Sequence, residues 1–173
     1  MSDPGKPEVW LRGPLPDVIA ELQPVAHSLL QVREEIAQAA SVSPAQLWAR
    51  PGGAASIGFH LMHLAGSLDR LLTYARGHAL NASQRAALAA EDREDTSRDA
   101  EDLVKAALDA LDRALVHVQT TALCTLDEVR EVGRAHLPST VLGLLFHAAE
   151  HAQCHSAQII TTRKVVDAMF PPS

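Results

Sequence analysis

The chain is poor in cysteine and in long hydrophobic runs, and each shortage removes a class of protein. Two cysteines among 173 residues are too few for a disulfide framework. No stretch approaches the roughly 18 consecutive apolar residues of a membrane-spanning helix. The opening residues, Met-Ser-Asp-Pro-Gly-Lys-Pro, contain no apolar run of the kind that a signal peptide needs. We therefore expect a cytoplasmic protein with no membrane association.

An excess of positive charge is also missing. The sequence has 15 lysines and arginines against 21 aspartates and glutamates, which gives a net charge of -6 with neutral histidines. Its basic residues are scattered, and Arg163-Lys164 is the one adjacent pair. Proteins that bind the phosphate backbone gather such residues into clusters. We therefore expect no nucleic-acid partner.

Internal repeats and sustained β alternation are absent, whereas helical periodicity is strong. Apolar residues recur three and four positions apart in four long segments. These are residues 17–40, 56–76 and 97–120, and a segment that starts after Pro138-Ser139-Thr140. Four amphipathic segments of this kind are typical of a four-helix bundle. The prediction is an all-α protein with a single domain over residues 1–173, in which residues 1–13 form an extended leader.

Short signals divide the connections between these segments. Asp17 is interpreted as a cap or first-turn acid of the first helix. Ser43-Pro44 predicts a single helical turn, because serine caps helices and proline fits the first helical position. Residues 81–90 suggest a short helix opened by Ser83. Residues 91–102 are dense in charge, which predicts a solvated loop that runs into the next helix.

Three histidines stand at four-residue spacing in the last segment: His147, His151 and His155. A helix advances about 100° per residue, so each step of four turns by only about 40° and the three imidazoles share one face. Neighbouring imidazoles at this spacing can both reach one cation of the zinc class, at about 2.0–2.1 Å. A cation held by two histidines of one helix needs a further ligand from another element.

The second helical segment offers that ligand. His60 and His63 lie on or beside its apolar face, but they are three residues apart and cannot both point identically into the core. The best set is therefore His63, His151 and His155. Three histidine ligands leave a fourth position for water, which is the arrangement of catalytic rather than closed structural zinc sites.

The alternative is a set of ordinary structural histidines. One histidine on an amphipathic helix is usually a surface residue or a core residue with satisfied hydrogen bonds. Five histidines on two adjacent helices are harder to explain in this way, because each neutral imidazole that faces a core needs hydrogen-bond partners. The spacing therefore favours a metal site.

Other catalytic templates fit less well. His147-Ala-Ala-Glu-His151 formally matches the H-x-x-E-H pattern of inverzincin proteases, but no glutamate follows Glu150 to act as their downstream ligand. A carboxylate-bridged di-iron bundle needs Glu-x-x-His on two helices, and this sequence has no Glu-x-x-His. The Gly-x-Ser-x-Gly turn that presents a nucleophilic serine is absent as well.

Two stretches resemble the DinB/YfiT-like superfamily of metalloenzymes. They are Gly53-Ala-Ala-Ser-Ile-Gly-Phe-His-Leu-Met-His63-Leu-Ala and Leu144-Leu-Phe-His-Ala-Ala-Glu-His151-Ala-Gln-Cys-His155-Ser-Ala-Gln158-Ile. The resemblance covers nearly the whole chain and implies a four-helix bundle with a three-histidine site for zinc or nickel, often in a homodimer. By motif position the metal ligands would be His63, His151 and His155, in agreement with the spacing.

The resemblance defines the reaction less closely than the fold. Characterised relatives include mycothiol-dependent isomerases and bacillithiol or glutathione S-transferases, whereas many members have no known activity. A divalent metal ion and a low-molecular-weight thiol are the cofactors that this implies, and a small molecule is the expected substrate. His60 and His147 are the weaker candidates for acid–base work, with His60 interpreted as a noncatalytic boundary residue and His147 as lining the cavity mouth.

Other residues near the triad have ordinary interpretations beside their functional ones. Gln158 either supports His155 or makes an interhelical hydrogen bond. Glu150 lies about 100° around the helix from His151, which favours a solvated position. Cys154 is interpreted as a small buried hydrophobe. Asp69-Arg70 forms either an ion pair at a subunit contact or part of a hydrated helix face.

Two functions stay open from the sequence. In the first, a cation with an open position binds a thiol, lowers its pKa and promotes S-transfer or isomerisation of a small electrophile. In the second, the metal stabilises a noncatalytic bundle that serves in stress response or partner binding. A cavity beside the histidines would favour the enzyme, and a closed fourth ligand would favour the noncatalytic module.

Overall fold

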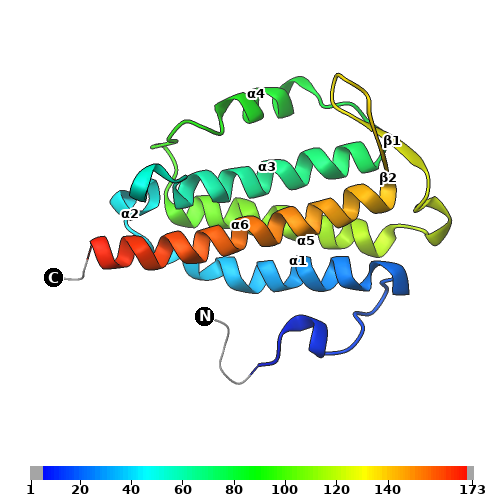
Figure 1. The fold of residues 1–173 in the computed structure, drawn as a ribbon, viewed down its shortest axis with the longest axis horizontal. Coiled ribbons are helices and arrows are strands. Elements are labelled where there is room, and N and C mark those ends of the chain that lie inside the picture. The colour runs from blue at the N-terminus through cyan, green and yellow to red at the C-terminus, as the bar shows by residue number, and fades with distance from the viewer. Residues whose placement is uncertain (1–5, 171–173) are drawn as a thin grey trace.

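Four long helices lie side by side in the computed structural model, which describes residues 6–170 (Figure 1). They are α1 (Gln23–Ile36), α3 (Ile57–Ala75), α5 (Ala100–Thr120) and α6 (Val141–Met169). Helices α1 and α3 each pack against both α5 and α6, so the four close a ring around one apolar core. The predicted all-α four-helix bundle is confirmed. Among residues 6–170, no helix combines the length and apolar character that crossing a membrane requires.

The apolar stripes of the sequence build this core. On α3 the leucines at 61, 64, 68 and 72 are all buried, at the spacings of three and four that keep them on one face. On α6, Leu144, Ala148 and Ile159 form a corresponding buried stripe. His151 and His155 share that stripe by the same periodicity. The helix faces that make the core therefore also carry the histidines.

Helices α3 and α5 run in the same direction, so the chain between them must travel back along the bundle (Figure 1). This crossover, residues 76–99, contains α4 (Ala82–Ala90), which packs on α3. Asn81 caps α4: its side chain accepts from the Gln84 N–H, and the Gln84 side chain accepts from the Asn81 N–H. The expectation that Ser83 opens this helix is wrong, because the reciprocal pair forms two residues earlier.

The other helix starts agree with the sequence in part. The turn after Ser43-Pro44 is present as α2 (Pro44–Trp48), with Ser43 as its cap. Asp17 neither caps nor enters the first helix, because its φ is 61° and left-handed backbone cannot join an α-helix. A 3-10 turn at Ala20–Leu22 follows, and α1 begins at Gln23. Helix α5 begins after Asp99, which forms a capping box with Asp102.

A small hairpin connects α5 to α6, which the sequence did not indicate. Strand β1 (Val129–Val132) pairs antiparallel with β2 (Leu137–Thr140). The sequence shows no sustained alternation here because strands of four residues are too short for it to be recognised. Gly133 and His136 turn the chain with φ values of 70° and 50°. The hairpin ends at Thr140, where α6 begins.

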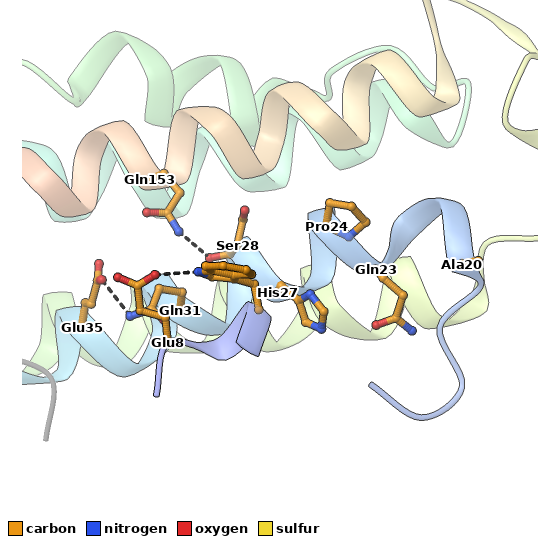
Figure 2. Close-up of a pocket in the computed structure, with 10 residues that line it drawn as sticks. Glu8, Ala20, Gln23, Pro24, His27, Ser28, Gln31, Glu35 and Gln153 are labelled. Carbon is orange, nitrogen blue, oxygen red and sulfur yellow. Dashed lines mark hydrogen bonds between the residues drawn. The ribbon is translucent and has the colours of Figure 1, made fainter. Parts of the chain in front are cut away.

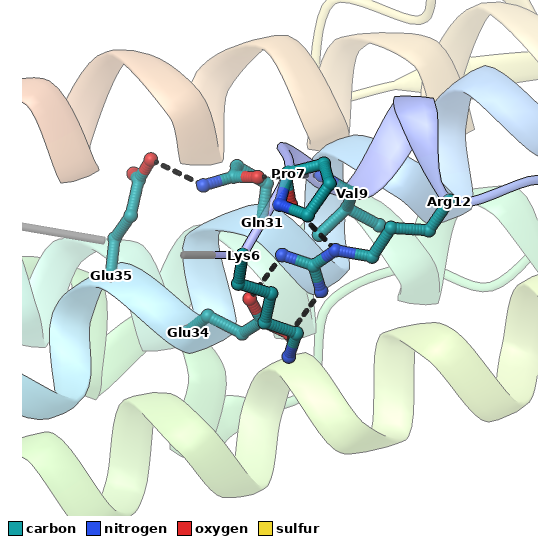
Figure 3. Close-up of polar contacts among 7 residues, drawn as sticks. All are labelled: Lys6, Pro7, Val9, Arg12, Gln31, Glu34 and Glu35. Carbon is teal, nitrogen blue, oxygen red and sulfur yellow. Dashed lines mark hydrogen bonds and ion pairs between the residues drawn. The ribbon is translucent and has the colours of Figure 1, made fainter. Parts of the chain in front are cut away.

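The described part of the N-terminal segment is fastened to α1 rather than simply extended. It forms one 3-10 turn, Val9–Leu11, and Val9 is buried. The Arg12 guanidinium donates to both carboxylate oxygens of Glu34, at 2.7 and 2.9 Å, and lowers the pKa of Glu34 to about 2 (Figure 3). The Val9 N–H donates to Gln31 Oε1. Residues 1–5 of the predicted leader lie outside the described residues.

We expect Thr140→Ala to destabilise the bundle by about 1 kcal/mol, because the Thr140 side chain accepts from the Gly143 N–H at 3.0 Å and caps α6. The measurement is chemical denaturation followed by circular dichroism. Thr161→Ala is the matched control, since Thr161 is exposed inside the same helix and alanine is the better helix former. Equal stability of the two variants would contradict the capping role.

Candidate metal centre

Helices α3 and α6 bring three histidine side chains together. His63 comes from α3, and His151 and His155 come from successive turns of α6. Each offers a ring nitrogen, and these nitrogens lie within 4.8 Å of one another. The Nε2 atoms of His63 and His151 are 3.0 Å apart. The residues that the sequence grouped as a candidate ligand set are therefore neighbours across the α3–α6 contact.

The cluster has the dimensions and chemistry of a site for a zinc-class cation. Two imidazole nitrogens at about 2.0–2.1 Å from a tetrahedral ion lie about 3.3 Å apart. The Nε2–Nε2 distance of 3.0 Å between His63 and His151 needs only a small adjustment to reach that value. Imidazole suits zinc, nickel and other divalent transition metals better than magnesium or calcium. The donor set therefore fits a divalent transition-metal ion.

The buried carboxylate of Glu91 contacts the ring nitrogen Nδ1 of His63. This nitrogen lies 2.7 Å from Glu91 Oε2, and the Arg70 guanidinium donates to both oxygens of the same carboxylate. Burial alone raises the pKa of Glu91, but the hydrogen bonds from His63 and Arg70 outweigh it and the pKa is lowered. An ionised carboxylate only accepts hydrogen bonds. The His63 proton therefore sits on Nδ1, and the Nε2 lone pair faces His151.

The burial of Glu91 and Arg70 differs from what the sequence predicted for them. Glu91, expected in a solvated loop, is 7% exposed, and Arg70, expected at a subunit contact or on a hydrated face, is 8% exposed. The physical reason is the crossover, which returns over α3 and places the first residue of the charged run against it. One feature of the sequence is consistent with this burial. Gly66 lies between His63 and Arg70 on α3, and a side chain at Gly66 would collide with the Glu91 carboxylate and the Arg70 guanidinium.

His60 is buried rather than at the boundary of the core. It is 7% exposed, and its Nδ1 lies 2.9 Å from Nδ1 of His155. One of these two nitrogens must donate and the other accept, so Nδ1 of His155 is engaged. Nε2 of His155 is available to a cation in the tautomer in which Nδ1 of His155 carries the proton and donates to His60. His60 therefore supports a member of the cluster and is not itself among the three residues that converge.

Burial keeps the imidazoles of His151 and His155 neutral. Desolvation, with smaller contributions from the neighbouring histidines, lowers the pKa of His155 to about 3. Desolvation is also the main reason that the pKa values of His60 and His151 are lowered. Metal binding requires an unprotonated imidazole nitrogen. The folded chain therefore holds His151 and His155 in the protonation state that a cation needs.

A cavity of about 260 Å³ opens beside the cluster. His63 and His151 line it. The other lining residues from α3 and the crossover are mostly apolar, among them Leu71, Leu80 and Leu88, and also include Ser67 and Arg70. His147 lies at this cavity and is exposed, in agreement with its expected place at the mouth. Its ring centre is 5.5 Å from that of His151. A small molecule in this cavity would touch two of the three histidines.

Larger cavities lie elsewhere. One of them, of about 630 Å³, lies between the N-terminal segment, α1 and α6 (Figure 2). Gln153 of α6 donates to the Ser28 carbonyl there, and none of the three histidines is among its described lining residues. Size alone would select this cavity, but its side chains do not converge on a point as the imidazoles do. The chemistry of the side chains therefore selects the smaller cavity.

The remaining candidates on α6 lie outside the cluster. Cys154 is exposed, so its interpretation as a buried hydrophobe is wrong. It is one residue from His155, which turns it about 100° away from the buried stripe. Gln158 is exposed as well. Glu150 is exposed as expected, and its carboxylate lies 3.4 Å from Nδ1 of His147.

Comparison with known protein families places this chain beside a described family. A family model described as the DinB superfamily matches residues 13–159, which include His63, His151 and His155. No curated protein matches the chain.

We expect the protein stripped of metal to lose stability in acid. Histidines of the unfolded chain gain protons near pH 6.5, whereas folded His155 stays neutral down to about pH 3, so the unfolded state binds more protons between these values. Stability is therefore full above about pH 6.5 and falls toward pH 3, by up to about 1.4 kcal/mol per pH unit from His155.

The measurement is chemical denaturation at about pH 7.5 and about pH 5. The free energy of unfolding should differ less between the two pH values in His155→Gln than in the unaltered protein. His78→Gln, at an exposed position, is the control and should keep the full difference. An unchanged difference in His155→Gln would show that His155 is not the group that resists protonation.

Proposed function

The chain belongs to the DinB superfamily, and from that premise we propose that it is a metal-dependent enzyme whose cation is held by His63, His151 and His155. The observation that carries the proposal is the convergence of three imidazole nitrogens within 4.8 Å beside an open cavity. We propose zinc or nickel as the metal, because a set of imidazole ligands suits both.

We further propose that the enzyme uses a low-molecular-weight thiol. A divalent cation at the three histidines would lower the pKa of a thiol that reaches it. We propose the exposed imidazole of His147, which lines the cavity, as the acceptor of the thiol proton. The sulfur would then form a bond to an electrophilic carbon, and in S-transfer a leaving group would depart with its electron pair. His60 is less suited to this role because its Nδ1 is engaged with His155.

The cavity argues against the noncatalytic alternative. A module that uses its metal only for stability would close the site with a fourth protein ligand. Among residues 6–170, three side chains converge, and a cavity of about 260 Å³ lies next to His63 and His151. That space suits the sulfur end of a thiol and a small electrophile, and the rest of the thiol would extend past His147. The apolar walls favour an electrophile with an apolar body.

We expect His63→Ala, His151→Ala and His155→Ala each to weaken metal affinity by more than about 100-fold, because each leaves two protein ligands. His60→Ala and His147→Ala should change it less. The measurement is zinc titration against a competing chelator. Helix content should stay nearly constant by circular dichroism, since the leucine-rich core holds the bundle.

Two results would contradict this assignment. Loss of metal from His147→Ala with retention by His63→Ala would restore the H-x-x-E-H interpretation. Unchanged affinity in all five variants would make the histidines structural and remove the main support for an enzyme.

We expect thiols to reach the metal. Protein loaded with cobalt should gain a sulfur-to-cobalt absorption band when glutathione, bacillithiol or mycothiol is added, whereas His147→Ala should gain it only at higher pH because the proton acceptor is missing. A cobalt-loaded protein whose spectrum ignores all three thiols would contradict the thiol proposal and favour the noncatalytic module.

A further inference from the structure

We propose that Glu91 is the positioning residue of His63 and that it links docking of α4 to metal occupancy. The inference rests on the metal site proposed above. It concerns a residue that binds no cation itself, since its carboxylate contacts His63 and Arg70 and lies outside the converging set.

The first support is the geometry of the carboxylate. Glu91 Oε2 lies 2.7 Å from His63 Nδ1, and Arg70 holds both carboxylate oxygens from the other side. Because the ionised carboxylate accepts only, it selects the tautomer of His63 whose Nε2 lone pair faces the cluster. It also fixes the rotation of the ring. Partners of this kind behind a histidine ligand commonly change metal affinity by 10–100-fold.

The second support is the space kept for this carboxylate. Gly66 lies on α3, one turn after His63 and one turn before Arg70. A Cβ at Gly66 would collide with Glu91 Oε1 and with the Arg70 guanidinium. Glycine is unfavourable inside a helix, and its backbone here needs no positive φ. The missing side chain is therefore explained by the Glu91 carboxylate, which occupies its place.

The third support is the weak attachment of α4. None of its nine residues, all of them described, is buried, and Leu88 is 46% exposed. Polar contacts hold the two ends instead. Near the first end, Gln84 Nε2 donates to Asp69 Oδ2 at 2.7 Å and to Thr73 Oγ1 at 2.8 Å. At the other end Glu91 binds His63 and Arg70. A segment with so little apolar burial opens at low free energy.

These contacts couple the segment to the metal. A cation on Nε2 of His63 requires the proton to stay on Nδ1 and makes that N–H a stronger donor to Glu91. Metal binding therefore stabilises the docked position of α4. By thermodynamic reciprocity, docking of α4 through Glu91 strengthens metal binding to the same degree. Because Leu88 of α4 and Leu80, two residues before α4, line the cavity, undocking of α4 would also change access to it.

The first experiment measures zinc affinity of four proteins by competition with a chelator: the unaltered chain, Glu91→Gln, Gly66→Ala and Glu94→Gln. Glu94 is an exposed glutamate of the same segment and serves as the matched control. We expect Glu91→Gln and Gly66→Ala to lose about 10–100-fold in affinity and Glu94→Gln to change less than about twofold. If Glu91→Gln and Gly66→Ala bind zinc as tightly as Glu94→Gln does, the proposal is overturned.

Gly66→Ala separates positioning from folding. Alanine is the better helix former, so this variant should keep or gain thermal stability while it displaces the Glu91 carboxylate. A loss of affinity without a loss of stability supports the positioning role. A loss of affinity that only accompanies unfolding in both Gly66→Ala and Glu91→Gln would overturn it.

The second experiment needs no metal, so it distinguishes failure of this proposal from failure of the proposed function. Imidazole nitrogen NMR of the protein stripped of metal, at a pH where histidines are neutral, should show His63 protonated on Nδ1. In Glu91→Met, which cannot accept a hydrogen bond, the proton should shift toward Nε2. An unchanged His63 tautomer in Glu91→Met overturns the positioning role, even if the unaltered protein binds zinc tightly.

The third experiment tests the link to α4. Backbone hydrogen exchange across residues 82–91 should slow when zinc is added to the unaltered protein and to Glu94→Gln. The slowing should be much smaller in Glu91→Gln, measured at zinc concentrations that saturate both proteins. Equal slowing in Glu91→Gln would show that α4 responds to the metal without Glu91 and would overturn the coupling.

Discussion

The packing of α3 against α6 is the contact on which the candidate site depends. His63 is on one helix and His151 and His155 are on the other, so the distance between their nitrogens follows the distance between the helices. Buried neighbours on the same stripes, such as Leu64 on α3 and Ala148 on α6, set that distance. Close-packed interiors tolerate little movement. The core therefore supplies the rigidity that a three-ligand site would require, and the three histidines lie on a contact that the core already holds.

Charge around the histidines is balanced by one ion pair. Arg70 lies close enough to His151 to contribute to the lowering of its pKa, and a second positive charge nearby would disfavour a cation. Glu91 compensates for Arg70 and at the same time accepts from His63. A buried ion pair contributes little net stability because both groups lose water. Its presence here is better explained by the electrostatic needs of the cluster than by the stability of the bundle.

The parts of the molecule that follow from local periodicity were predictable from the sequence. The four helices and the grouping of His151 with His155 depend on spacings of three and four residues, and His63 followed from the need for a ligand on a neighbouring helix. Glu91 was not predictable, because its burial depends on the path of the crossover and not on its charged neighbours in sequence. His60 was placed at the boundary because the sequence does not show which residue of α6 it meets. The hairpin strands are too short to give a pattern.

The shared direction of α3 and α5 has a consequence for how this chain can change over time. The return path leaves residues 76–99 outside the bundle core, apart from a few anchoring side chains such as Glu91. Insertions and substitutions in such a connection cost little stability, since few apolar contacts depend on it. The same connection forms one wall of the cavity beside the histidines. The shape of the cavity can therefore change by rebuilding this wall while the helices and their imidazoles stay as they are.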